Sequence, residues 1–323
     1  MKKEKNSIIS LVYLFLLCFA ISGVPATPGV QAEQNEKLVI FHAGSLSVPL
    51  KDMTEAFKKK YPKVEVIRES AGSRQCARKI TELNKQADIM FSADTSVIKT
   101  LLMPEYTQWS INFATNEMII MYRNDSKYAD RINGKNWGEI LLKDGVTYGH
   151  ADPNADPCGY RSQLTWQLAE KYYKTPGLYS KLRAKSHIVR PKETDLLALL
   201  ESGQIDYLFI YKSVAEQHNA KFVVLPDEVN LKNEKYESIY GTVSIDLTGK
   251  EPGEIIKQKG GSMVYGVTIP KNAPNYKLAL EYVKLVIGPE GQKIMAKNGQ
   301  IPFNPATSDE KDKLPAELKA LVK

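Results

Sequence analysis

Cysteine and histidine are scarce in this sequence, whose 323 residues include three cysteines and four histidines. So few cysteines exclude a disulfide-stapled scaffold. The histidines, His42, His150, His187 and His218, lack the spacing of zinc ligands. The chain has no low-complexity tract and no internal repeat at solenoid periods. What remains, 43% hydrophobic and 25% charged residues, is typical of a globular protein with one large or two medium domains.

A concentrated positive patch is also absent. The formal net charge is +7, but the lysines are scattered rather than gathered in a stripe with stacking aromatics. Such a stripe is what nucleic-acid binding requires, so we expect no nucleic-acid partner. A modest positive field can still help to steer a small anion.

The most hydrophobic stretch, Ile8–Ala20, is shorter than a membrane span. It follows three lysines and precedes the small-residue sequence VQA, so we predict a cleaved signal peptide over residues 1–32. The mature chain would then be exported to the periplasm or cell surface. A lipid anchor on Cys18 is the alternative, although the bulky Leu17 before it fits a lipoprotein signal poorly.

From Lys37 onward, strand and helix patterns alternate in two blocks of about 100 residues each. This alternation predicts an α/β fold with doubly wound sheets. The final two helices lack strands of their own, so we expect them to return to the first block. The result is a two-lobed clamshell with a ligand cleft at the carboxyl ends of the strands. We predict lobe I from residues 33–114 plus about 272–323, and lobe II from about 115–271.

Four turns share one pattern, in which a strand ends, small or polar residues follow, and a helix begins. They are Ala43-Gly44-Ser45, Ala71-Gly72-Ser73, Asp156-Pro157-Cys158-Gly159 and Pro191-Lys192-Glu193-Thr194. A helix N-terminus offers free N–H groups and a partial positive charge, which together suit an anion. Ordinary helix capping explains each turn taken alone. Two Gly-Ser turns after strands of one sheet favour an anion site.

Asp156 and Glu193 do not fit a simple anion site, because a carboxylate repels an oxyanion. They would stabilise helix N-termini, coordinate a cation, or approach the central atom of the oxyanion itself. A thiol hydrolase that uses Cys158 beside His150 is a weaker alternative, since no third orienting group is evident. Other candidates are three arginines that could neutralise an anion and two tyrosines on one strand: Arg74, Arg78, Arg161, Tyr207 and Tyr211.

Five motifs occur in a fixed order: FHAGSLSVP, SAGSRQCARKI, DPCGYRSQL, LLESGQIDYLFIYKSVA and VYGVTIPKNA. With PEYTQWSINFATNEMIIMYRNDSKYAD, they resemble the tungstate/molybdate-binding proteins of ABC transporters (the WtpA type) over residues 37 to 303. The resemblance implies a type II periplasmic-binding-protein clamshell that closes over one oxyanion. It also implies a monomer without cofactor or catalysis, which delivers tungstate or molybdate to a membrane permease.

The resemblance further implies which residues contact the ligand: Gly44, Ser45, Ser73, Asp156, Pro157, Cys158, Glu193 and Tyr211. Asp156 and Glu193 would approach tungsten or molybdenum and expand it toward six ligands. Sulfur and phosphorus would not accept such extra ligands, so the pair would reject sulfate and phosphate. Asp195 remains a rival to Glu193, because the two point about 200° apart on a helix. Sulfate, or ferric iron held by a tyrosine, is the alternative ligand.

Two cysteines remain after cleavage of the predicted signal peptide, and each lies in or beside one of the binding turns. They are Cys76 and Cys158. Export would permit a disulfide between them. We treat that pairing as a hypothesis, because spacing alone does not show whether the two thiols meet.

Overall fold

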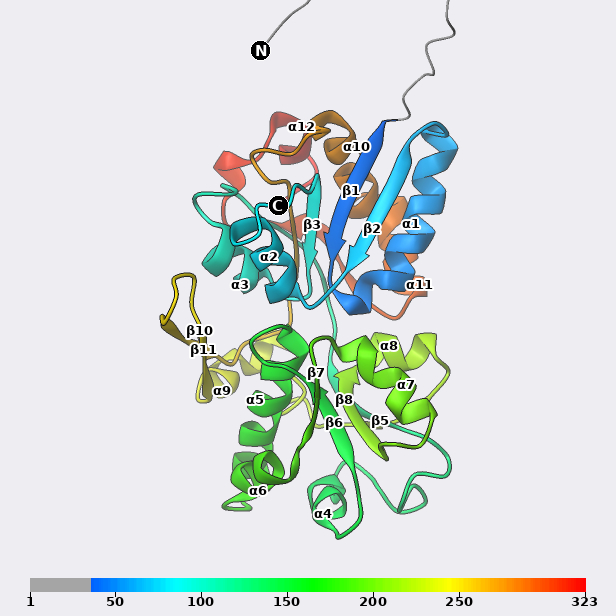
Figure 1. The fold of residues 1–323 in the computed structure, drawn as a ribbon, viewed down its shortest axis with the longest axis vertical. Coiled ribbons are helices and arrows are strands. Elements are labelled where there is room, and N and C mark those ends of the chain that lie inside the picture. Colours follow the sequence, from blue (N-terminus) through cyan, green and yellow to red (C-terminus); the bar gives the residue numbers. More distant parts are fainter. Residues whose placement is uncertain (1–35) are drawn as a thin grey trace, which may run out of the picture. The chain divides into compact units, whose positions relative to one another are not determined.

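The computed structural model describes residues 36–323 (Figure 1), so the predicted signal peptide 1–32 lies outside the described residues. The described chain contains two mixed β-sheets flanked by helices, and a separate two-stranded ribbon. The predicted α/β class with two mixed sheets is confirmed. None of the helices within 36–323 combines the length and the hydrophobicity that a membrane-crossing segment needs.

The first sheet has six strands. Their order across the sheet is β13 (Ile301–Thr307), β4 (Ile111–Thr115), β12 (Tyr265–Thr268), β3 (Ile89–Ser92), β1 (Lys37–His42) and β2 (Glu65–Ser70). Strands β1, β2 and β3 run parallel, whereas β12, β4 and β13 join by antiparallel pairing. Alternating apolar residues such as Leu38 and Ile40 are fully buried, which is why β1 lies inside the sheet.

The second sheet has five strands. Their order is β7 (Ile188–Arg190), β6 (Tyr148–Ala151), β8 (Tyr207–Tyr211), β5 (Met118–Tyr122) and β9 (Lys221–Val224). Strand β6 pairs in parallel with β7 and β8, while β5 pairs antiparallel with β8 and β9. The central strand β8 is buried along its whole length, as its continuous apolar sequence predicts.

α-Helices alternate with the strands along the described chain. They are α1 (Ser47–Lys60), α2 (Ser73–Thr81), α3 (Thr95–Val97), α4 (Trp137–Leu142), α5 (Pro157–Tyr172), α6 (Leu178–Lys185), α7 (Leu197–Glu201), α8 (Lys212–Gln217), α9 (Glu237–Tyr240), α10 (Tyr276–Ile287), α11 (Pro289–Lys297) and α12 (Ala316–Lys319). Short 3₁₀ turns cover Gly44–Leu46, Glu193–Leu196, Glu234–Tyr236 and Lys311–Lys313, and a π turn covers Ile98–Leu102. The ribbon pairs β10 (Ser244–Thr248) with β11 (Ile255–Lys259).

The terminal helices return to the first sheet, as expected. Tyr282 of α10 packs its ring 5.1 Å from that of Phe57 in α1, and its hydroxyl lies 3.1 Å from Thr54 Oγ1. Strand β12 also belongs to this sheet, although it lies before residue 271. The chain therefore returns to the first sheet by Tyr265, earlier than the predicted boundary, and the division into lobes stays a prediction.

Strand register places the four turns at matching sheet edges. In the first sheet His42 lies opposite Ser70 and Phe91, so β1, β2 and β3 end together. In the second sheet Ala151 lies opposite Arg190, so β6 and β7 end together. Because the carboxyl ends of parallel strands share one edge, each sheet presents two of the turns side by side.

Candidate ligand-binding site

The two Gly-Ser turns of the first sheet contact the two carboxylate turns of the second sheet. A Cβ atom on Gly44 would lie 2.8 Å from Glu193 Oε1 and 2.9 Å from Glu193 Oε2. A Cβ atom on Gly72 would collide with the carbonyl of Ala155 and lie 3.0 Å from Asp156 Cβ. Glycine is therefore required at position 72, where a side chain would collide with backbone, whereas at position 44 a Cβ would displace the Glu193 carboxyl group. These contacts bring together four segments that lie far apart in the sequence.

Three carboxylate oxygens at this junction, both of Glu193 and Oδ2 of Asp156, receive no well-aligned hydrogen bond from a protein donor within residues 36–323. Glu193 and Asp156 are 0% and 1% exposed. The groups that face these oxygens are the two carboxyl groups themselves and the backbone at Ser45 and Glu193. Buried polar atoms are almost always paired, so these oxygens point to a ligand that pairs with them.

Burial raises the pKa of both carboxyl groups. The pKa of Glu193 lies well above its usual value because the group is desolvated and because the charge of Asp156 is close by. Burial raises the pKa of Asp156 as well. Two adjacent charged carboxylates in a site without water raise the free energy of the folded protein. An electron-poor atom bound between them offsets that increase.

The site hydroxyls are oriented as donors. Ser73 Oγ accepts a hydrogen bond from the Ala93 N–H at 2.9 Å, and Tyr211 Oη accepts one from Arg161 Nη1 at 3.1 Å. Ser45 Oγ accepts one from the Tyr265 hydroxyl at 3.0 Å. A hydroxyl that accepts from the protein keeps its own hydrogen for another acceptor. All three side chains are buried, so that acceptor is expected in the site.

Helix capping accounts for the position of Asp156 but not for those of Ser45 and Ser73. Asp156 Oδ1 accepts from the Cys158 N–H at 2.7 Å and so caps α5, which begins with Pro157. Neither Gly-Ser turn has a side-chain cap. Neither Ser45 nor Ser73 therefore acts as a helix cap. Asp156 caps α5 with its Oδ1 atom, and its Oδ2 atom takes no part in the cap.

Several predicted candidates lie away from the junction. The Asp195 side chain is 41% exposed and pairs with Lys192 at 3.1 Å, so the structure places Glu193 rather than Asp195 beside Gly44. The Tyr207 hydroxyl donates to the Lys127 carbonyl. Arg74 and Arg78 both donate to the Thr248 carbonyl of the ribbon. Arg74 Nε also donates to the Asn154 carbonyl at 3.2 Å, just before the Asp156 turn.

Arg161 is buried at the junction, but its guanidinium group pairs with Asp94 rather than with Asp156 or Glu193. Its Nη2 lies 3.0 Å from Asp94 Oδ2, and its Nη1 donates to the Ala93 carbonyl at 2.7 Å. The Tyr160 hydroxyl donates to the same Asp94 oxygen at 2.6 Å. Asp94 follows strand β3 and so shares the edge that carries both Gly-Ser turns, a position that would have identified it from the sequence. These contacts join the first sheet to α5 beside the site.

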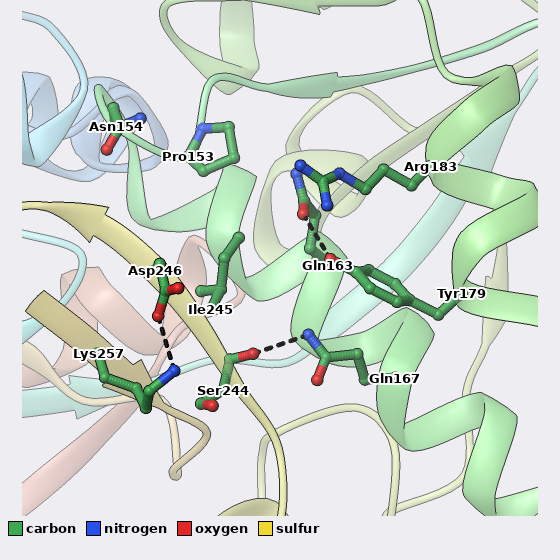
Figure 2. Close-up of a pocket in the computed structure, with 10 residues that line it drawn as sticks. All are labelled: Pro153, Asn154, Gln163, Gln167, Tyr179, Arg183, Ser244, Ile245, Asp246 and Lys257. Carbon is green, nitrogen blue, oxygen red and sulfur yellow. Dashed lines mark hydrogen bonds and ion pairs between the residues drawn. The ribbon is translucent and has the colours of Figure 1, made fainter. Parts of the chain in front are cut away.

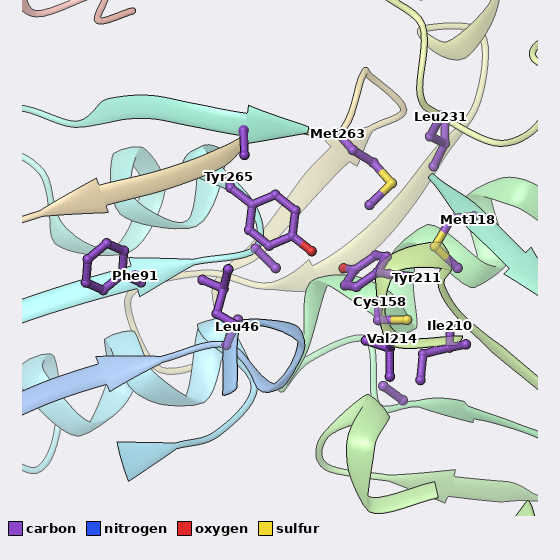
Figure 3. Packing of buried hydrophobic residues seen from close by; sticks show 14 of the residues in the cluster. Leu46, Phe91, Met118, Cys158, Ile210, Tyr211, Val214, Leu231, Met263 and Tyr265 are labelled. Carbon is purple, nitrogen blue, oxygen red and sulfur yellow. The ribbon is translucent and has the colours of Figure 1, made fainter. Parts of the chain in front are cut away.

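A pair of tyrosine rings completes this junction. Figure 3 shows Tyr265 and Tyr211 with their hydroxyl groups turned toward each other, beside Cys158. The ring centroids lie 6.2 Å apart at 66°. Tyr265 was not among the predicted site residues, although it lies in the motif VYGVTIPKNA.

Comparison with known proteins decides the family, because residues 38–300 match the bacterial extracellular solute-binding proteins. The chain belongs to this family. An uncharacterized solute-binding protein of Petrotoga mobilis is 57% identical over 289 residues, 89% of this chain and 90% of that protein. The molybdate/tungstate-binding protein WtpA of Thermococcus kodakarensis is 40% identical over 343 residues, 97% of this chain and 95% of that protein.

Solved structures of other solute-binding proteins share the fold. The periplasmic molybdate-binding protein of Azotobacter vinelandii matches 82% of this chain and 98% of its own, with a TM-score of 0.59 and 16% identity. The sulfate-binding protein SubI of Mycobacterium tuberculosis matches with a TM-score of 0.58 and 13% identity. These likenesses establish the two-lobed clamshell fold for this solute-binding protein and do not distinguish its ligand.

The two described cysteines of this solute-binding protein are both free, so the hypothesised disulfide is absent. Cys76 Sγ contacts the His42 carbonyl and Cys158 Sγ contacts the Phe209 carbonyl, each at 3.6 Å. Burial raises the pKa of the Cys158 thiol well above its usual value. A thiol held in its neutral form is a poor nucleophile, which counts against the thiol hydrolase.

A polar pocket of about 380 Å³ lies between α5, α6 and the ribbon (Figure 2). Within it, Lys257 pairs with Asp246 at 2.7 Å, and Gln167 donates to the Ser244 carbonyl at 2.9 Å. None of the eight predicted ligand residues lines this pocket. This pocket is therefore separate from the four turns.

His42, which precedes the first Gly-Ser turn, makes the fold sensitive to acid. The side chain is 1% exposed, and burial lowers its pKa from 6.5 to about 4. Between these values the unfolded chain binds more protons than the folded one, so the free energy of unfolding falls as the pH falls. The loss of unfolding free energy approaches about 3 kcal/mol below pH 4.

Urea unfolding of His42→Gln between pH 7 and 4 should show a weaker pH dependence than wild type, whereas His187→Gln, at an exposed residue, should match wild type. Equal pH dependence in wild type and His42→Gln would contradict this assignment.

Proposed function

We propose that this protein captures tungstate or molybdate between its two sheets, at the four turns. The observation that carries the proposal is the pair of buried carboxyl groups, Asp156 and Glu193, which face each other opposite turns with hydroxyl donors. The identity to WtpA proteins over nearly the whole chain supports it.

The geometry suits a tetrahedral oxyanion whose central atom accepts further ligands. Ser45, Ser73 and Tyr211 would donate to its oxygens, together with the backbone N–H of Gly44. Pro157 has no N–H to donate, and the Cys158 N–H is held by Asp156, so these two residues would line the site without donating. Asp156 and Glu193 would approach the metal and bring it toward six ligands. One oxygen of Asp156 remains bound to the Cys158 N–H, which fixes the direction of the other.

Sulfate and ferric iron fit the same site less well. Sulfur does not expand its coordination, so sulfate would meet two carboxylates in a dry site with nothing to offset their repulsion. Iron would need an ionised tyrosine, yet burial raises the pKa of Tyr211 well above its usual value. Residues 36–323 also contain no group of three or more His, Cys, Asp or Glu side chains placed to hold a cation.

We infer that the mature chain works outside the cytoplasmic membrane and delivers its ligand to an ABC permease. Membership of the extracellular solute-binding family supports this role. In this role the chain is a monomeric binding protein without catalytic activity.

Thermal unfolding with a panel of oxyanions tests the proposal. Tungstate or molybdate at about 100 times its Kd should raise the free energy of unfolding by about 2.7 kcal/mol, and Tm by roughly 5 °C. Sulfate and phosphate at equal concentration should leave Tm within about 1 °C by the same relation. An absence of any shift with tungstate and molybdate up to millimolar concentration, or an equal shift with sulfate, would contradict the proposed function.

A further inference from the structure

The hydroxyl of Tyr265 lies between a binding serine and the segment that joins the two sheets. Tyr265 is the first residue of β12 and is fully buried. Its hydroxyl donates to Ser45 Oγ at 3.0 Å and accepts from Asn116 Nδ2 at 3.1 Å. Asn116 lies between β4 of the first sheet and β5 of the second, and it is also buried.

The orientation of the Asn116 amide follows from its other partners. Its Oδ1 accepts from the Glu117 N–H at 2.9 Å and from the Ser213 N–H at 3.4 Å. A backbone N–H can only donate, so the oxygen must face these two groups and the NH₂ must face the other way. That NH₂ donates to Ser213 Oγ at 2.7 Å and to the Tyr265 hydroxyl.

The direction of each hydrogen bond in this chain is therefore determined. Because Asn116 supplies a hydrogen to the Tyr265 oxygen, the Tyr265 hydrogen is directed to Ser45. Ser45 Oγ then accepts, and its own hydrogen remains for a further acceptor. The Ser45 carbonyl is held as well, since Gln300 Nε2 donates to it at 3.1 Å.

We propose that Tyr265 is a positioning residue, oriented by Asn116, that makes the Ser45 hydroxyl an obligate hydrogen-bond donor to the bound oxyanion. This proposal rests on the proposed function. A serine hydroxyl that does not accept such a hydrogen bond can rotate among several acceptors. Ligand binding then fixes the hydroxyl in one orientation, which costs entropy. With Tyr265 in place the hydroxyl is aligned before the ligand arrives, so the hydrogen bond to a dianion forms at lower entropic cost.

Tyr265→Phe tests the proposal, with Tyr282→Phe as the matched control. Tyr282 is equally buried and its hydroxyl donates to the Leu50 carbonyl at 3.2 Å, in the α1–α10 contact. Calorimetry with sodium tungstate and sodium molybdate should show roughly tenfold weaker binding for Tyr265→Phe and wild-type affinity for Tyr282→Phe. Thermal unfolding without ligand should show similar losses for both variants, since each removes one buried hydroxyl.

A double-mutant cycle with Ser45→Ala separates positioning from a general loss of packing. If Tyr265 acts through Ser45, then adding Tyr265→Phe to Ser45→Ala should change the Kd by less than about twofold. Additive losses, or unchanged binding in Tyr265→Phe, would overturn the positioning role while leaving the proposed function intact. If wild type binds neither tungstate nor molybdate, the proposed function and the positioning role both fail.

Asn116→Asp provides a second variant if Tyr265→Phe does not fold. The new carboxylate can only accept, so the Tyr265 hydrogen would turn toward residue 116 and away from Ser45. Tungstate binding should then weaken at least as much as in Tyr265→Phe, and the Ser45→Ala background should again remove the difference. Wild-type affinity in Asn116→Asp would overturn the proposal.

Discussion

Asp156→Asn should lose about 10²–10³-fold in tungstate affinity while the unliganded protein becomes at least as stable as wild type. The affinity falls because the amide no longer offers an anionic oxygen to the metal, a loss of about 3–4 kcal/mol for a buried charged partner. The helix cap survives, because asparagine Oδ1 can accept from the Cys158 N–H as Asp156 does. Stability is expected to rise because one of two adjacent desolvated carboxylates is removed.

Calorimetry with tungstate and thermal unfolding without ligand measure the two effects separately. Asp152→Asn is the matched control, since Asp152 lies in the same loop, four residues before Asp156, but its Oδ1 accepts from the Asn154 N–H at 2.8 Å. That variant should bind tungstate as wild type does. An Asp156→Asn protein with wild-type affinity would show that the carboxylate does not reach the metal.

Glu193→Gln should also weaken tungstate binding by at least about 100-fold, whereas Asp195→Asn should change the Kd by less than about twofold. Glu193 is buried against Gly44 and faces Asp156, so its carboxyl group lies where a ligand between the two carboxyls would contact it. Asp195 is 41% exposed and pairs with Lys192 in solvent, where an ion pair contributes little.

The two variants together decide which acidic residue of this turn belongs to the site. Calorimetry on Glu193→Gln, Asp195→Asn and wild type under one set of conditions gives the comparison. Greater loss in Asp195→Asn than in Glu193→Gln would reverse the assignment. Unliganded Glu193→Gln should unfold at a higher temperature than wild type, because the substitution removes one of the two adjacent desolvated carboxyl groups.

The strand–turn–helix alternation of the sequence was sufficient to predict the two sheets and the four turns at the ends of their strands. The β10–β11 ribbon was missed because most of its side chains are exposed, so it lacks the regular apolar alternation that marks a strand.

The choice between Glu193 and Asp195 depended on a local detail that hydrophobic periodicity does not report. The apolar pattern of KETDLLALLESGQ is that of one continuous helix that ends at Gly203. The structure instead has a 3₁₀ turn, Glu193–Leu196, before the short helix α7. With three residues per turn, two residues separated by one position point about 240° apart, and Glu193 faces inward.

Contacts between distant residues could not be predicted from local patterns. Arg161 was considered either a solvated helix residue or a cation for the ligand, but it is buried and paired with Asp94, 67 positions earlier. The bonds that link Asn116, Tyr265 and Ser45 likewise join three separate segments. Such pairings depend on how the two sheets meet, which periodicity along one chain does not encode.

The close approach of Glu193 to Asp156 affects how readily the protein closes when it carries no ligand. When the two sheets meet without cargo, two acidic groups are confined in a dry space, and this opposes closure. Bound tungstate or molybdate would remove the opposition, so the compact conformation would be populated chiefly by loaded molecules. A membrane partner that recognises the compact conformation would then seldom engage an empty carrier, and few transport cycles would be spent without cargo.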